Sequence, residues 1–219
     1  MPRFKDKEII KSIGQIYLDD PVYLIQSLIV ESGEEHIGFR VEKVIEAITA
    51  LATESGIATE VAYLMVWFMD AGLVVDESLY LDIVKEYKYD EYRDDKIPKF
   101  EKQNKYFMHG RIGELMLSNM YMIGDDNFAK AVCYHETLLP GREHTSLEKI
   151  LFIADKLVPK FDNDSHVEIV SQGLRESYNS AIRNYLEWYL DNAPTLQLKI
   201  HPYMPQVLQE YRNFSKNFN

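Results

Sequence analysis

Residues 61–70 read VAYLMVWFMD, an uncharged run that ends at Asp70. A helix that is apolar on every side belongs inside a bundle, because none of its faces is suited to water. We therefore expect 61–69 to form a helix at the centre of the fold, with Asp70 at its carboxyl end. Gly72 follows closely and favours a stop there.

The segments around this run repeat their apolar residues at helical spacing. Upstream, one stripe is ended by Gly56 and consists of Val41, Val44, Ile45, Ile48, Leu51 and Ala52. Downstream, the same spacing predicts helices over 110–120, 125–134, 146–157, 166–190 and 203–213. No Asn-Gly or Asp-Gly hairpin separates alternating runs. The sequence predicts an all-α, single-domain helical bundle over 36–219, preceded by an N-terminal helical arm over 1–35.

Composition excludes several classes of protein. The net charge of −11 makes the chain a poor binder of nucleic acid, which requires a basic face. No uncharged stretch approaches the roughly 18 residues of a membrane span. The single cysteine, Cys133, rules out a disulfide framework and is expected to be a small buried hydrophobe. The charged N-terminus, MPRFKDKEII, is unlike a signal peptide, so we expect a cytoplasmic protein.

Four residues with metal-binding side chains fall on or beside the apolar helices: Asp70, His109, His135 and Asp155. Ionised side chains are rarely buried without a partner, and a metal ion is one such partner. Each of the four comes from a different helical segment. We therefore expect them to converge on one point inside the bundle.

Five further stretches carry a resemblance to a known family: YFMHGRIGELM (106–116), AVCYHETLLPG (131–141), SLEKILFIADKLVP (146–159), NSAIRNYLE (179–187) and IHP (200–202). Together they resemble the HD-domain phosphohydrolases, and among them the symmetrical diadenosine tetraphosphate hydrolases, over about residues 38–213. The resemblance implies an HD-type helical domain with two metal ions, typically iron. It also implies hydrolysis of dinucleoside polyphosphates by metal-activated water.

The family's site residues carry over unevenly. By resemblance, Asp70 is the catalytic aspartate that bridges the metals, and His109, His135 and Asp155 are further ligands. Arg40 stands where the family has its first histidine. Met69 and Leu73 replace a second histidine and a lysine expected near phosphate, and these departures all affect the first metal. The chain therefore resembles a metal-dependent phosphohydrolase that lacks two histidine ligands.

The departures have a physical interpretation. Without a metal, Asp70 and Asp155 would raise each other's pKa and destabilise the fold. The planar fork of Arg40 can pair bidentately with carboxylates, so we expect it within ion-pair distance of Asp70 or Asp155 in place of the ion, while Met69 fills the remaining space. The alternative is that Arg40 extends to the surface.

The other half of the site is expected to survive. Asp70, His109 and His135 form a set that can hold one divalent ion (iron, manganese or zinc) with open positions. Alternatively, they are three separately hydrogen-bonded residues and no metal binds. His36 is a further, substitute ligand candidate one helical turn before Arg40.

Basic residues near the expected pocket are candidate phosphate contacts, with ordinary surface charge as the alternative: Arg111, Arg142 and Lys149. The segment 76–105 is dense in charge and tyrosine, and it reads either as a solvated helix and loop or as a flap over the site.

Three functions compete. The favoured hypothesis is a degenerate protein of this type that binds a nucleotide or another phosphate ligand with weak or no hydrolysis. The second is an active one-metal phosphohydrolase on nucleotides or dinucleoside polyphosphates. The third is a non-catalytic helical interaction protein. The expected partner is a small phosphorylated molecule, not a nucleic acid or a membrane, and a homodimer is compatible with each hypothesis.

Overall fold

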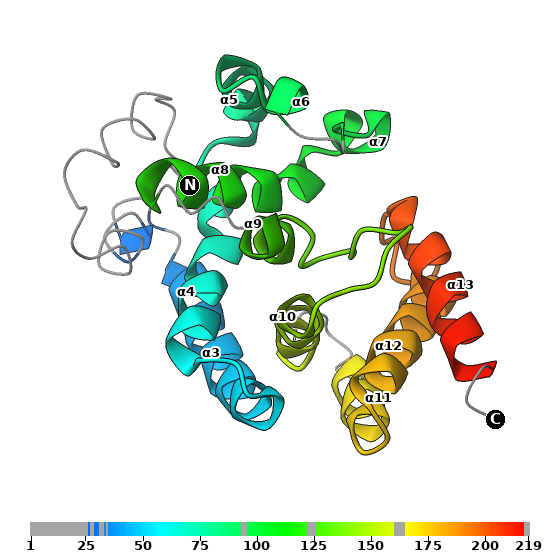
Figure 1. Cartoon of the computed structure of the whole chain (residues 1–219). Coiled ribbons are helices and arrows are strands. Elements are labelled where there is room, and N and C mark those ends of the chain that lie inside the picture. Colours follow the sequence, from blue (N-terminus) through cyan, green and yellow to red (C-terminus); the bar gives the residue numbers. More distant parts are fainter. Residues whose placement is uncertain are drawn as a thin grey trace.

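The computed structural model describes residues 26, 29–30, 33, 35–92, 96–121, 126–159 and 165–216. These residues form helices and connecting turns, with no β-strand among them (Figure 1). The predicted all-α class is confirmed. The arm predicted over 1–35 falls almost wholly outside the described residues. None of the helices in the described part of the chain is long and apolar enough to cross a membrane.

The helices and 3₁₀ turns (η) follow in this order: α3 (Glu35–Ser55), α4 (Thr59–Met69), η1 (Ala71–Val74), η2 (Glu77–Leu79), α5 (Tyr80–Glu86), α6 (Tyr89–Tyr92), α7 (Lys99–Gln103), η3 (Lys105–Met108), α8 (His109–Tyr121), α9 (Asp126–Cys133), α10 (Ser146–Lys156), α11 (Ser165–Leu174), α12 (Tyr178–Asn192) and α13 (Tyr203–Lys216).

Helix α4 contains the uncharged run, and it packs against α3, α8, α9 and α10. Every residue from Met65 to Asp70 is buried, whereas Tyr63 in the first turns is 37% exposed. The carboxyl half of α4 therefore lies in the core and carries Asp70 there, while its amino half reaches the surface.

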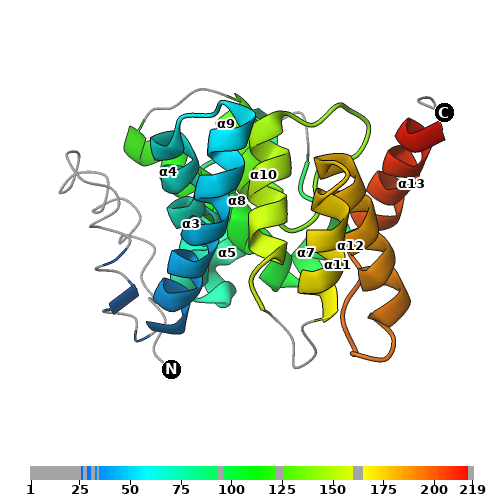
Figure 2. The ribbon, with the colours of Figure 1, turned by 90° about the horizontal axis from the view of Figure 1, so that it is seen from below.

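Helix α10 is the second central element. Figures 1 and 2 place it between the α3–α4 pair and the α11–α12 pair, and it packs against α3, α9 and α12. A capping box begins it: the Thr145 hydroxyl accepts from the Glu148 N–H, and the Glu148 carboxylate accepts from the Thr145 N–H. This fixed start sets the register that buries Asp155 near the end of the helix.

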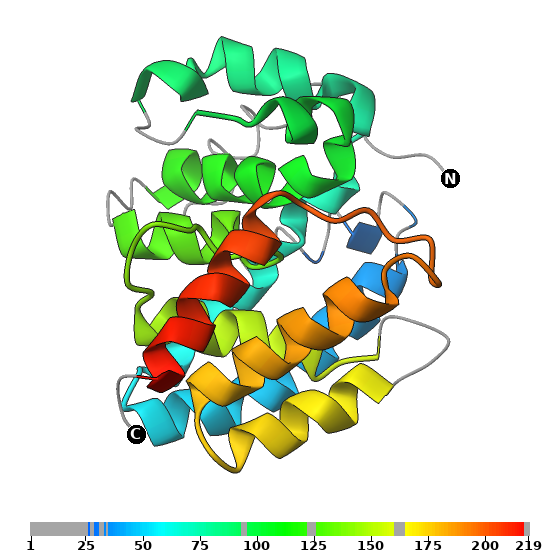
Figure 3. The same ribbon diagram turned by 90° about the vertical axis from the view of Figure 1, so that its right-hand side faces the viewer.

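The single helix predicted over 166–190 is wrong. The chain forms α11 and α12, which lie side by side (Figure 3). The Ser177 hydroxyl accepts from the Ser180 N–H at 3.0 Å and starts α12. A Cβ at Gly173 would lie 2.6 Å from the Ala181 Cα, so glycine allows the two helices to approach. The break therefore comes from a local cap and a close helix contact.

The expected short helix at the carboxyl end, over 203–213, is present as α13, and it extends to Lys216. It packs against α12.

The segment 76–105 is neither a solvated helix nor simply a flap. Tyr80, Tyr89 and Glu101 are buried, and α5 packs against α8. Among its described residues, Glu77 and the last three, Gln103 to Lys105, reach the cavity described below.

Close packing of η1 on α8 brings the site residues together. A Cβ at Gly72 would lie 2.1 Å from the His109 carbonyl oxygen, which leaves room for no other residue type. The Tyr80 hydroxyl donates to the Gly72 carbonyl at 2.7 Å and holds this turn from the other side. Asp70, two residues before Gly72, is thereby placed beside His109.

Candidate metal centre

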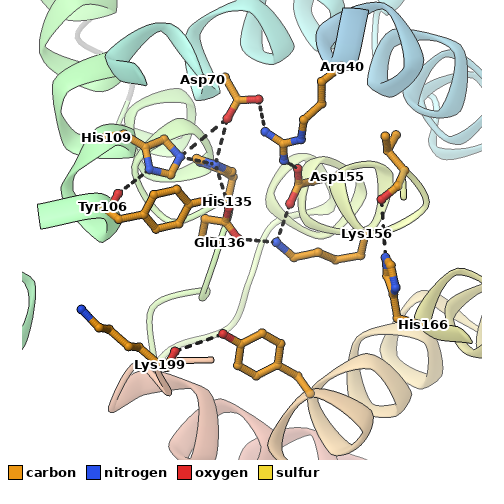
Figure 4. A network of polar contacts seen from close by, with 12 residues as sticks. Arg40, Asp70, Tyr106, His109, His135, Glu136, Asp155, Lys156, His166 and Lys199 are labelled. Atoms are coloured by element: carbon orange, nitrogen blue, oxygen red, sulfur yellow. Dashed lines mark hydrogen bonds and ion pairs between the residues drawn. The ribbon is translucent and has the colours of Figure 1, made fainter. Parts of the chain in front are cut away.

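Three buried side chains converge at the ends of three helices (Figure 4). Asp70 follows the last residue of α4, His109 begins α8, and His135 lies just after α9. The two Nε2 atoms lie 3.0 Å apart. The Asp70 Oδ1 atom lies 3.6 Å from His109 Nε2 and 3.8 Å from His135 Nε2. The structure thus brings together three of the four predicted ligands.

Backbone carbonyls fix the orientation and the tautomer of both imidazoles. His109 Nδ1 lies 2.6 Å from the Tyr106 carbonyl oxygen, and His135 Nδ1 lies 2.8 Å from the Val132 carbonyl oxygen. A carbonyl can only accept, so each Nδ1 carries the hydrogen. Each Nε2 is then left with a lone pair directed at the other and at Asp70.

The cluster is therefore a set of acceptors without a donor. Asp70 Oδ1 is buried and has no hydrogen-bond partner among the described residues. Burial, and next the neighbouring His109, lowers the pKa of His135 to about 4, so its imidazole is neutral at physiological pH. Two lone pairs and a carboxylate oxygen that face one another repel unless a cation lies between them.

These residues fit a single divalent ion. Two imidazoles and one carboxylate are a common ligand set with open positions. Two ligand atoms at about 2.1 Å from a metal and at right angles to each other lie about 3.0 Å apart. The Nδ1–H groups bound to carbonyls also provide the outer contacts that orient metal-binding histidines.

Asp155 does not join this cluster, because each of its oxygens is bound to an organic cation. Oδ1 pairs with Arg40 and Oδ2 pairs with Lys156. The other end of the Arg40 guanidinium pairs with Asp70 Oδ2. The predicted ion pair of Arg40 with Asp70 or Asp155 is confirmed, and the structure shows it with both; the alternative that Arg40 extends to the surface is wrong. Met69 is fully buried beside Asp70.

Lys156 is a site residue that the sequence analysis missed. Its fully buried ammonium lies 2.6 Å from Glu136 Oε2 and also pairs with Asp155. Burial alone would lower the pKa of Lys156, but the Asp155 and Glu136 carboxylates raise it well above its ordinary value. Arg40 and Lys156 together bring two positive charges to Asp155, the charge of one divalent ion. A lone lysine after Asp155 in the apolar stretch LFIADKLV was the available signal.

A cavity of about 840 Å³ adjoins the cluster, and Arg40, Tyr106 and Glu136 line it. The Tyr106 hydroxyl donates to Glu136 Oε1 at 3.2 Å, and its ring centroid lies 5.0 Å from that of His109. The neighbouring Glu136 charge raises the pKa of Tyr106 well above its ordinary value, so the hydroxyl stays protonated. Tyr106 and Glu136 thus stand between the cavity and the histidines (Figure 4).

The candidate phosphate contacts do not reach this cavity. Arg111 is buried and binds Glu101 through Nε at 2.5 Å and through a second nitrogen at 3.0 Å. Arg142 pairs with Glu148 of the capping box. Neither these two nor Lys149 is among the described residues that line the cavity.

Two other lysines line the cavity instead, Lys105 and Lys199. His36 also lines it from α3, but its side chain is exposed and is not part of the cluster, which consists of Asp70, His109 and His135 among the described residues. No spacing along the chain points to these lysines, because they come from separate segments.

Solved structures share the fold, and one of them is similar to most of this chain. It is from Clostridium acetobutylicum and is described as a "predicted HD superfamily hydrolase involved in NAD metabolism". It matches with a TM-score of 0.72 and 18% sequence identity, over 86% of this chain and 95% of that chain. The expected HD-type helical fold is confirmed by this likeness. No protein-family model matches the chain, and no curated protein matches it in sequence.

Proposed function

We propose that this protein is a degenerate member of the HD superfamily that binds one divalent metal ion through Asp70, His109 and His135. In the adjoining cavity it binds a small phosphorylated ligand, with weak or no hydrolysis. The observation that carries the proposal is the arrangement of the cluster. Both Nδ1 atoms lie against backbone carbonyls, so two neutral imidazoles would turn their Nε2 lone pairs toward each other and toward Asp70 Oδ1, which has no hydrogen-bond partner among the described residues. A buried arrangement of this kind is stabilised by a cation.

In this proposal, two protein groups take the place of the family's other metal ion, the one whose histidine ligands are replaced by Arg40 and Met69. Arg40 bridges Asp70 and Asp155, and Lys156 holds the remaining Asp155 oxygen. The pKa of Arg40 is raised above its ordinary value, because the Asp155 and Asp70 charges outweigh the effect of burial. Its guanidinium therefore remains protonated and cannot accept a proton from water. It can only offset negative charge.

The presence of Arg40 and Lys156 in place of a metal ion is the reason to expect weak hydrolysis. A metal pair would activate water and stabilise charge on the attacked phosphate. Here Arg40 and Lys156 supply charge without that activation. Each 1.4 kcal/mol or so of lost transition-state stabilisation slows the reaction about tenfold.

The cavity supports a phosphorylated ligand. Its volume of about 840 Å³ lies within the range of about 300–1,000 Å³ for small-molecule sites. Arg40, Lys105 and Lys199 place positive charge on its wall, and Phe107 and Tyr185 offer aromatic surface. A nucleotide is the favoured class, since the structural neighbour is described as involved in NAD metabolism. The narrower expectation, a dinucleoside tetraphosphate, rests on the sequence resemblance alone.

The test combines metal analysis with turnover. Protein purified without chelator, with iron, manganese, cobalt or zinc supplied, should hold one metal per chain and bind a nucleoside polyphosphate. Its turnover of diadenosine tetraphosphate should be far below the usual enzyme range of about 1–1,000 per second. His109→Ala should lose the metal, whereas the control His36→Ala should keep it, because His36 lines the cavity outside the cluster.

The alternatives give different results. Chelator-sensitive turnover within the usual enzyme range would establish the one-metal phosphohydrolase instead. Absence of both metal and ligand binding would favour the helical interaction protein.

The converse test restores the missing groups. Arg40→His, Met69→His and Leu73→Lys return the side chains that the family resemblance implies, and Leu73 already lines the cavity. Because Lys156 also occupies Asp155, we expect a second metal and a gain of turnover only when Lys156→Met is added. A second metal in the triple variant alone would show that Lys156 does not block the position.

A further inference from the structure

We propose that Glu136 is a fourth protein ligand of the metal ion, which it reaches by leaving Tyr106 when the ion binds. This inference rests on the proposed one-metal site. Glu136 directly follows His135 and lines the cavity, so it approaches the cluster from the side that Asp70 and the histidines leave open. Its Oε1 atom lies 4.0 Å from His135 Nε2.

The two oxygens of Glu136 have different surroundings. Lys156, fully buried, holds Oε2 at 2.6 Å and anchors the carboxylate. Oε1 receives a longer hydrogen bond, 3.2 Å, from the hydroxyl of Tyr106, a side chain that is 44% exposed. The bond to Tyr106 is the weaker restraint, because it is long for an O–H···O⁻ bond and its donor is uncharged, whereas Lys156 brings an opposite charge to the carboxylate. Oε1 can therefore turn toward the cluster while Oε2 stays on Lys156.

The separation is suitable for a shared ion. Two ligand atoms at about 2.1 Å from one metal can be separated by up to about 4.2 Å when they lie on opposite sides of it. The 4.0 Å between Oε1 and His135 Nε2 falls inside that limit. Asp70, His109 and His135 contribute one carboxylate oxygen and two imidazole nitrogens, so Glu136 would add a second negatively charged ligand.

Metal affinity and the ligand-field spectrum test the assignment. The affinity for Co²⁺ and Mn²⁺ is measured by competition with a chromophoric chelator, and the visible spectrum of the Co²⁺ form is recorded. Glu136→Gln should weaken binding at least about 10–100-fold, the loss typical even of outer contacts to a metal. It should also change the Co²⁺ absorption bands. The matched control is Glu77→Gln, which removes another cavity carboxylate and should change affinity by less than about threefold.

A second variant covers the case in which Glu136→Gln folds poorly. Tyr106→Phe removes the hydroxyl that competes for Oε1 and leaves Lys156 in place. It should raise metal affinity by about two- to tenfold, the equivalent of one net hydrogen bond. A fall in affinity would show instead that the Tyr106–Glu136 bond supports the site as it stands, and would overturn the proposal.

The remaining outcomes separate this inference from the proposed function. If the wild-type protein and the Glu136→Gln variant bind Co²⁺ equally, with identical spectra, the Glu136 assignment is wrong and the three-ligand site stands. If Glu136→Gln and Glu77→Gln weaken metal binding equally, the effect is one of general negative charge, and the Glu136 assignment is also wrong. If the wild-type protein binds no metal, the proposed function fails first.

Discussion

Arg40→Leu should destabilise the metal-free protein by about 3–5 kcal/mol, the usual result of removing one partner from a buried ion pair. The guanidinium is the shared partner of two fully buried carboxylates. Asp155 retains Lys156 in the variant, but Asp70 retains only the two histidines beside it. The loss therefore falls mainly on Asp70. It is a large share of a total stability of about 5–15 kcal/mol.

The assay is urea unfolding followed by circular dichroism in the presence of a chelator. Arg212→Leu is the control, because Arg212 pairs with Glu187 at 2.8 Å but is 50% exposed. An exposed pair contributes at most about 1 kcal/mol. The two variants thus remove the same side chain from a buried and from a solvated ion pair.

A double-mutant cycle tests whether the loss of stability comes from the unpaired charge of Asp70. In an Asp70→Asn background, Arg40→Leu should cost less, by about 0.5–3 kcal/mol, because the uncompensated charge is gone. Adding Mn²⁺ at about 100 times its dissociation constant should restore about 2.7 kcal/mol to the Arg40→Leu variant if its metal site is intact. The reasoning is refuted if Arg40→Leu costs no more than Arg212→Leu, or if the cycle is additive.

Three further predictions concern the surrounding structure. Gly72→Ala should lower the stability by about 1–3 kcal/mol or more and should also lower the metal content, because its Cβ would lie 2.1 Å from the His109 carbonyl oxygen. Urea unfolding and metal analysis of the variant test this prediction. Cys133 should react with iodoacetamide far more slowly in the native than in the urea-unfolded protein, because burial raises the pKa of its thiol to about 12; equal rates would contradict this. Burial would raise the pKa of Glu101, but its bonds to His201 and Arg111 outweigh that effect and lower the pKa in the folded protein. The stabilisation that Glu101 provides should therefore be present above the ordinary glutamate pKa of about 4.3 and be lost as the pH falls further. The difference in unfolding free energy between wild type and Glu101→Gln should shrink below that pH.

The fold and the contact of Arg40 with the aspartates could be predicted from the sequence, because both depend on the positions of residues along helices. An uncharged run of helical length has to be buried, and its last residue, Asp70, is carried into the core with it. Similarly, Arg40 lies on the stripe of α3 that faces α4 and α10, so its approach to both aspartates follows from the register.

What the sequence could not predict depends on side-chain direction and on short caps. Lys156 follows Asp155 directly, and adjacent residues on a helix normally point about 100° apart. Lysine nevertheless reaches the same carboxylate, because its long flexible stem can fold back at the end of α10. The break between α11 and α12 depends on one serine cap, which the apolar spacing does not reveal.

Lys156 and Glu136, two residues to which the sequence pattern did not point, change the charge balance of the site. Asp70, Asp155 and Glu136 are three carboxylates, and they face two organic cations, Arg40 and Lys156. Without a metal, this network of five side chains carries one negative charge in excess, and that charge opposes the attraction of Lys105 and Lys199 on the cavity wall for a phosphate. A divalent ion reverses that sign. Binding of metal and of phosphate should therefore be coupled, and because linkage is reciprocal, the ligand should tighten the metal by the same factor as the metal tightens the ligand.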